Sequence, residues 1–237
     1  MATKNTKQKD DTPTLNIITP KGVAIWPRLN KPDEEYNVYK CRLRLDPDDA
    51  EVSALVDKLT KLRDKYHKQV VADLTARGKA NSVKNVIVRD VFAQDLDDKE
   101  NETGLIVLSA KTKASGTYAD GKAWKRKPVI FDAKGSKLKD PPLIYGGSEL
   151  KLACLAKPYS MQIDSESKGK TVKKLAIGVT LYLNAAQVIK LVSGGGPQDA
   201  EGFGFREEDG YEAADETFGS EGAEESDADS AGDSDDF

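Results

Sequence analysis

Cationic and aromatic residues are interleaved between Lys111 and Lys127. Lysine and arginine neutralise phosphates, and exposed rings stack on unpaired bases, each stacked base contributing roughly 1–3 kcal/mol. This combination predicts a surface that holds single-stranded nucleic acid. The alternative is a solvated hairpin whose Trp124 packs on the rest of the domain. Ala119-Asp120-Gly121 predicts the turn of that hairpin. The candidate binding residues here are Lys111, Lys113, Tyr118, Lys122, Trp124, Lys125, Arg126 and Lys127.

Alternating segments place further cations on the outside of the same domain. In Val38 to Leu45, apolar Tyr39, Cys41, Leu43 and Leu45 alternate with Lys40, Arg42 and Arg44. This period of two predicts a half-buried strand with a basic outer face. Leu105 to Lys113 and Glu149 to Lys157 alternate in the same way. They add Lys151 and Lys157 to the candidates, and Trp26 and Tyr159 are further stacking candidates, although an aromatic side chain suits a core equally well.

One long amphipathic helix lies between these strands in the sequence. Asp46-Pro47 predicts its start, with the aspartate as the N-cap and proline in the first turn. Apolar residues then recur every three or four positions from Val52 to Leu74, until Gly78. The chain's single histidine, His67, has charged neighbours on this helix, which favours a surface residue over a catalytic one.

The remaining segments predict a mainly β domain. At least five short antiparallel strands are expected, at Val86 to Phe92, Leu105 to Lys113, Pro128 to Phe131, Glu149 to Ala156 and Lys174 to Leu183. Short strands with one inserted helix favour an OB-fold, a small Greek-key barrel, over a parallel α/β sheet. A β-sandwich would show a similar periodicity.

The charge of the chain is divided between a basic body and an acidic end. From Glu207 to Phe237 there are fourteen acidic residues and no lysine or arginine, which leaves 26 acidic against 36 basic residues before them. The body is therefore formally +10 and the tail −14. We expect a flexible N-terminal arm over residues 1–13, the OB-fold domain over 14–193, and a disordered acidic tail over 194–237 that begins with the glycine-rich hinge Gly194 to Pro197.

Several functional classes lack their signatures in this sequence. There is no phosphate-binding loop, nucleophile elbow or zinc-protease motif, and the single histidine excludes paired-histidine sites, so we expect a protein that is not an enzyme and has no metal or cofactor. Cys41 and Cys154 lack metal-site spacing and are expected to be small core residues. No signal peptide or membrane-spanning segment is recognisable, which favours a soluble, intracellular protein.

The central part of the chain resembles the single-stranded DNA-binding proteins of short-tailed, podovirus-type bacteriophages. The similar residues run from Val129 to Lys137, from Pro142 to Lys151 and through Pro158-Tyr159, together with the strand Val38 to Leu45 and the terminus Asp235-Asp236-Phe237. Between Asp46 and Gly104 the helix matches, but individual residues do not.

This resemblance implies an OB-fold with a packed helix and sequence-independent binding of single-stranded DNA. It further implies a homodimer that acts in phage DNA replication, recombination and repair in the cytoplasm of the infected bacterium. Family members contact the replicative DNA polymerase and the primase-helicase through the acidic tail, here Asp233, Asp235, Asp236 and Phe237. In the family's late strand and basic hairpin strand, the DNA contacts correspond to Tyr159, Lys111 and Lys113, with Trp26 as a candidate near the first strand.

The leading hypothesis is a basic, aromatic groove that coats single-stranded DNA, with the acidic tail occupying that groove when DNA is absent. One rival is a nucleic-acid-mimicking interaction protein whose acidic tail binds a basic partner while the barrel only folds. A second rival is a single-stranded RNA binder, because OB barrels bind both polymers.

Overall fold

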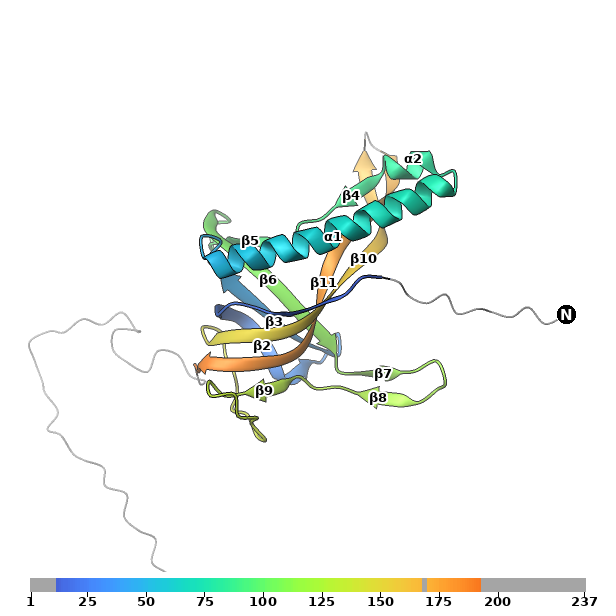
Figure 1. Ribbon diagram of the computed structural model, residues 1–237. Coiled ribbons are helices and arrows are strands. Elements are labelled where there is room, and N and C mark those ends of the chain that lie inside the picture. The colour runs from blue at the N-terminus through green and yellow to red at the C-terminus, as the bar shows by residue number, and fades with distance from the viewer. Residues whose placement is uncertain (1–11, 168–169, 193–237) are drawn as a thin grey trace, which may run out of the picture. The chain divides into compact units, whose positions relative to one another are not determined.

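A closed β-barrel forms the centre of the computed structural model, which describes residues 12–167 and 170–192 (Figure 1). Neighbouring strands pair in the order β2, β3, β6, β11 and β10, and β10 pairs back to β2. The predicted antiparallel pairing holds for four of these pairs and is wrong for β6–β11, which is parallel. The strands are β2 (Gly22–Asp33), β3 (Val38–Leu45), β6 (Glu102–Lys113), β10 (Glu149–Ser167) and β11 (Lys170–Lys190). The prediction of a mainly β chain is confirmed, and this strand order is OB-like.

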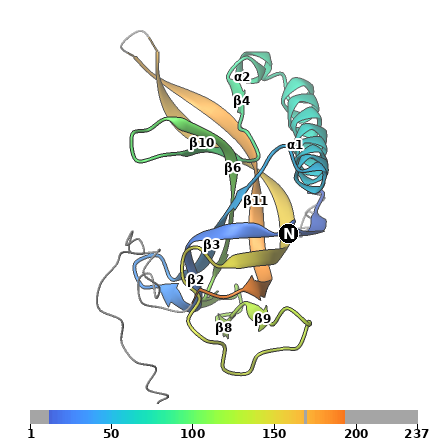
Figure 2. The same ribbon diagram turned by 90° about the vertical axis from the view of Figure 1, so that its left-hand side faces the viewer.

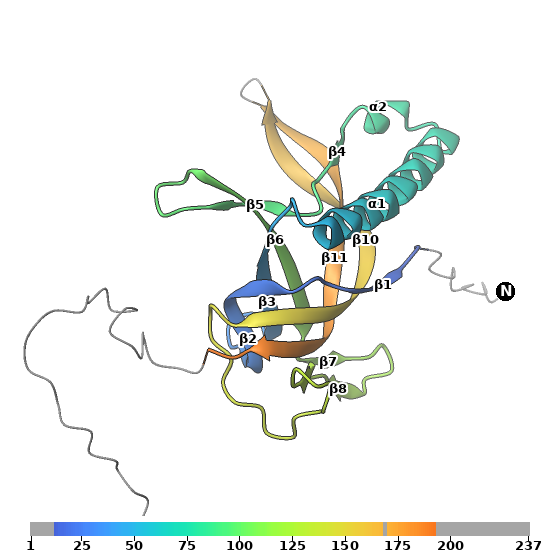
Figure 3. The same cartoon turned by 60° about the vertical axis from the view of Figure 1, so that its left-hand side comes forward.

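Shorter strands extend the barrel at its edges. β1 (Leu15–Ile18) pairs with β10, and β5 (Ala93–Leu96) pairs with β6. β4 (Val86–Val88) and β9 (Val129–Phe131) run parallel to β11. β7 (Ser115–Thr117) and β8 (Ala123–Lys125) form a separate hairpin. Figure 3 shows the β7–β8 hairpin projecting from the end of the barrel away from the long helix.

The long helix α1 (Ala50–Ala76) is followed by the short helix α2 (Ala80–Val83). The predicted start at Asp46-Pro47 is wrong. The Asp46 carboxylate accepts the N–H of Asp48 in a turn, and Asp49 is the N-cap, its Oδ1 accepting the N–H of Glu51 at 2.7 Å. The competing turn therefore delays the helix by three residues, while its predicted end before Gly78 is correct.

Helix α1 lies beside β10 and β11 (Figure 2), and its apolar stripe packs into the hydrophobic core. Its buried members are Val52, Leu55, Leu59 and Leu62. The barrel interior holds the predicted inward residues of β3, β6 and β10, including both free cysteines. Burial raises the pKa of Cys41 and of Cys154 to about 12, because a thiolate would be desolvated there. Both thiols thus remain protonated. The prediction that Cys41 and Cys154 are core residues is confirmed.

β10 and β11 are longer than predicted and pair beyond the barrel as a two-stranded ribbon. β1, β2 and β5 were absent from the prediction. The sequence of β2 lacks a continuous period-two pattern, because the register of β2 with β3 shifts between Ile25 and Arg28. In the described part of the chain, no helix is long and apolar enough to cross a membrane.

Candidate nucleic-acid interface

A transverse row of outward side chains crosses four neighbouring barrel strands. Arg28 on β2 is in register with Lys40 on β3, Lys40 with Lys111 on β6, and Lys111 with Tyr182 on β11. Their chain neighbours Leu29, Cys41, Ala110 and Leu181 are buried, so the alternation of each strand directs the row outward. Adjacent strands lie about 4.8 Å apart, so three cations and one ring follow each other at short, regular intervals.

The cations of this row differ in how far they are already paired. Lys40 Nζ lies 2.7 Å from Asp33 Oδ2. The hydrogen bond from Lys40 is the largest cause that lowers the pKa of Asp33, and the hydrogen bond from the Tyr36 N–H is the second largest. Asp33 therefore stays ionised. Lys111 and its exposed neighbour Lys113 form no ion pair within residues 12–167 and 170–192. They are open to an external anion, whereas Lys40 is shared with Asp33.

Trp26 projects from a bulge beside this row. Its backbone has φ +44°, which is unusual for any residue but glycine and especially before a proline, here Pro27. The side chain is 74% exposed. The guanidinium carbon of Arg42 lies 5.9 Å from the ring centroid, within cation–π range. Strained backbone that exposes a large ring is typical of a functional position.

The predicted hairpin is present and holds its own tryptophan. The Tyr118 N–H donates to the Lys122 carbonyl across the turn at 2.8 Å. The Trp124 ring lies so close to Gly116 that a Cβ there would be 2.6 Å from the ring. The Arg126 guanidinium stacks 5.3 Å from its centroid, and the Tyr118 ring lies 6.3 Å away at a tilt. Trp124 therefore packs on its own hairpin.

The base of this hairpin and the β2–β3 turn enclose a basic hollow. Asn37 donates to Ser115 Oγ at 2.7 Å and accepts from the Ala114 N–H, which joins the two elements. The hollow is lined by Pro32, Asn37, Tyr39, Ala114, Ser115, Lys125, Arg126 and Lys127. Lys122 stands at the hairpin tip, 3.4 Å from Asp120.

Two further candidates continue the face onto β10. Lys157 is in register with Thr180, two residues before Tyr182 on β11, and both lie on the outer side. Tyr159 is in register with Gly178 and rests its ring on that glycine, where a Cβ would lie 2.7 Å from the phenolic oxygen. Lys157 therefore lies diagonal to Tyr182 at the end of the row, and Tyr159 is the next outward residue along β10.

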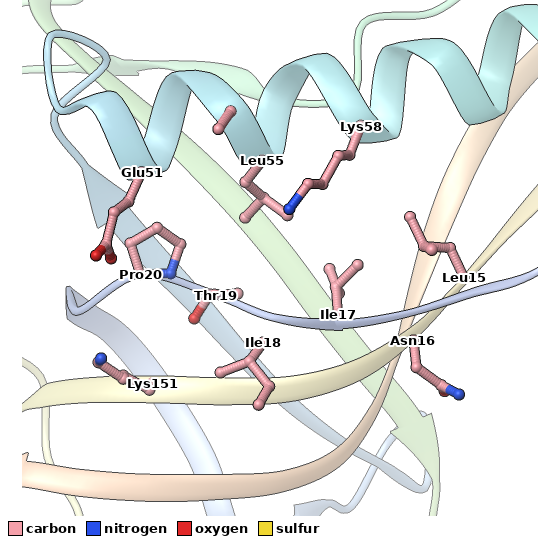
Figure 4. Close-up of a pocket in the computed structure, with 11 residues that line it drawn as sticks. Leu15, Asn16, Ile17, Ile18, Thr19, Pro20, Glu51, Leu55, Lys58 and Lys151 are labelled. Carbon is pink, nitrogen blue, oxygen red and sulfur yellow. The ribbon is translucent and has the colours of Figure 1, made fainter.

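Arg44 and Lys151 have other surroundings. Arg44 Nε lies 2.9 Å from Oδ2 of Asp95, which is buried and also accepts from Thr103 Oγ1. The Arg44 contact is an ion pair without an aligned hydrogen bond. Lys151 lines a hollow between β1 and α1, opposite Glu51 and Lys58 (Figure 4). The predicted tail residues Asp233, Asp235, Asp236 and Phe237 lie outside the described residues, as do residues 1–11 of the predicted arm.

Sequence reasoning missed Arg28 and Tyr182. Tyr182 stands between Leu181 and Leu183, so the alternation already placed it outward on a predicted strand. Arg28 follows the bulge, and no local pattern reveals its pairing with Lys40.

An OB-like barrel with a basic, aromatic outer face is typical of oligonucleotide-binding proteins. A family model described as the single-stranded DNA-binding protein of bacteriophage T7 matches residues 26–182. The chain therefore belongs to this family of phage single-stranded DNA-binding proteins.

Individual relatives agree with this assignment. The chain is 27% identical to the single-stranded DNA-binding protein of Enterobacteria phage T3 over 186 residues and to that of Escherichia phage T7 over 180 residues, covering 75% of this chain and 72% of each relative. The crystal structure of the T7 protein covers 85% of this chain and all of its own, with a TM-score of 0.55 at 22% identity. That likeness supports the OB-like fold.

The packing of Trp124 on Gly116 can be tested in a Trp26→Phe background, where Trp124 is the remaining tryptophan. We expect Gly116→Ala to displace the indole, because the new Cβ occupies its place. Tryptophan emission should shift to the red and acrylamide quenching should increase. Thr117→Ala, an exposed position on the same strand, is the matched control and should leave both unchanged. Identical spectra for all three proteins would contradict this packing.

Proposed function

We propose that this protein binds single-stranded DNA independently of sequence through the face that contains the row Arg28, Lys40, Lys111 and Tyr182. The observation that carries the proposal is the register of that row, because it combines cations with an exposed ring across four strands of an OB-like barrel. The family of the chain supports the same ligand.

Phosphates and bases are proposed to contact different members of this face. Arg28, Lys111 and Lys113 neutralise phosphates, while the rings of Trp26 and Tyr182 stack on bases. Such contacts carry no information about base identity, since every base has a stacking face and every nucleotide a phosphate. The hollow beside Lys125, Arg126 and Lys127 lies next to Lys113 and widens the proposed path at the ends of β3 and β6. Lys157 and Tyr159 are proposed to extend the path beyond Tyr182.

The acidic C-terminal segment is proposed to regulate this surface and to recruit partners. Fourteen acids on a chain whose body is formally +10 compete with DNA phosphates at a high effective concentration. Phe237 supplies an apolar anchor for the replicative DNA polymerase and the primase-helicase. The proposed setting is phage DNA replication, recombination and repair in the host cytoplasm, with the protein acting as a homodimer.

Titration with three polymers tests the proposed function. We expect oligo(dT) to quench the fluorescence of Trp26 and Trp124, and duplex DNA to bind weakly. If about four or five phosphates are neutralised, a plot of log K against log salt concentration should have a slope near −3, because each contact contributes about −0.7. Tighter binding of oligo(rU) would favour an RNA binder. A residue 1–206 protein without affinity for any single strand would favour the nucleic-acid-mimicking alternative.

Two substitutions separate the electrostatic from the stacking contribution. Lys111→Ala removes one phosphate contact, so the magnitude of the salt slope should fall by about 0.7. Tyr182→Ala should weaken oligo(dT) binding about fivefold or more at each salt concentration and leave the slope unchanged, because stacking involves no counterion release. Lys99→Ala, on the exposed β5–β6 turn, is the charge control and should bind normally. Equal effects of all three would refute the row as the binding surface.

Two deletions separate the proposed roles of the acidic segment. Removing residues 207–237 should tighten binding of oligo(dT) and flatten part of its salt dependence, because the competing acids are gone. Removing Phe237 alone takes away almost no charge, so it should leave DNA binding intact and weaken pull-down of the polymerase. Unchanged or weaker DNA binding by the protein without residues 207–237 would contradict competition between the acidic segment and DNA. Equal pull-down of the polymerase with and without Phe237 would show that Phe237 is not part of the polymerase contact.

A further inference from the structure

A second aromatic and apolar surface lies next to the row, on the far side of Arg28. A cleft separates the Trp26 to Lys31 part of β2 from residues 143–146, which precede β10. Trp26 and Arg28 both line this cleft. Arg28 is a member of the row, and Trp26 lies beside the row. Leu143 is 52% exposed and Tyr145 is 41% exposed. Among the described residues that line it, none is acidic.

Hydrogen bonds hold the two walls of the cleft together. The Asn30 side chain donates to the carbonyl oxygens of Pro141 and Pro142 at 2.9 Å, and its Oδ1 accepts from the Ile144 N–H at 3.2 Å. At the other end, the Gly147 N–H donates to the Ala24 carbonyl at 2.9 Å. A segment fixed at both ends displays Leu143 and Tyr145 without a large ordering cost on binding.

The chemistry of the cleft matches an unpaired nucleobase and its phosphate. A base needs flat apolar or aromatic surfaces, which Trp26, Leu143 and Tyr145 provide. A phosphate needs cations, and Arg28 and exposed Lys31 stand on the β2 wall. Arg28 also belongs to the row, so one strand can pass from Lys111 and Lys40 over Arg28 into the cleft.

We propose that this cleft is a base-binding subsite, in which a nucleobase of single-stranded DNA lies against Tyr145 and Leu143 while Arg28 and Lys31 contact the adjoining phosphates. The proposal rests on the proposed function and adds a segment of the DNA path that the row alone does not contain. It also gives a binding role to Pro142 to Tyr145, part of the block whose sequence resembles the phage proteins.

The test compares oligo(dT) with an oligomer of equal length that carries abasic residues. Tyr145→Ala in the full-length protein should weaken oligo(dT) binding about fivefold or more, the lower end of the effect of removing one stacking ring. Wild type and Tyr145→Ala should bind the abasic oligomer equally, because both keep the same phosphate contacts. Tyr145→Phe keeps the ring and should bind oligo(dT) as the wild type does.

Leu143→Ser is a second variant, with Leu96→Ser, a similarly exposed leucine on β5, as its control. We expect Leu143→Ser to weaken oligo(dT) binding and Leu96→Ser to leave it unchanged, with urea denaturation showing that each variant is folded. Full affinity of Tyr145→Ala for oligo(dT), or equal losses on both oligomers, would overturn the subsite and leave the proposed function standing. A wild-type protein that does not bind oligo(dT) would overturn both.

Discussion

Closure of the barrel is the constraint on which the proposed binding face depends. β10 pairs with β11 along its length and with β2 at its start, so the inner side of every barrel strand faces one shared core. A shift of one residue in any strand would move its apolar residues outward, at a large cost in buried surface. The register that keeps Cys41 and Ala110 inside therefore also aligns Lys40 with Lys111 outside. Core packing and the position of the cations are two results of one pairing.

This coupling explains how much of the fold and site was predictable from sequence. β3 was predicted with its correct bounds, because Tyr39 to Leu45 alternate without interruption. The outward lysines of β6 followed from the same rule. The row itself was not predictable, since Lys111 and Tyr182 meet through a parallel pairing between strands about seventy residues apart. The pairing of Arg28 was not predictable because the bulge at Trp26 interrupts the alternation of β2. The acidic partners of Arg44 and Lys40 are identified only by the three-dimensional structure.

Charge on a strand is therefore an incomplete guide to binding capacity. Lys40, Arg42 and Arg44 are equivalent in the sequence pattern, yet each has a different neighbour. Arg44 pairs with the buried Asp95, where loss of the cation would leave an uncompensated charge, so its first role is structural. Lys40 shares Asp33, and Arg42 stacks on Trp26. The lysines of β6 have no such partner in the described part of the chain, which makes that strand the most available to a polyanion.

Three aromatic residues of the proposed face share a different feature, because the backbone restricts the position of each ring. Trp26 is displayed by a strained bulge, Trp124 rests on Gly116, and Tyr159 rests on Gly178. A larger residue at either glycine would collide with the ring above it. Rings held before the ligand arrives lose little conformational entropy when a base stacks on them. Lysines remain mobile at their tips and can follow an irregular phosphate chain. Fixed rings with adjustable cations suit a ligand whose bases are alike in stacking but whose backbone path varies.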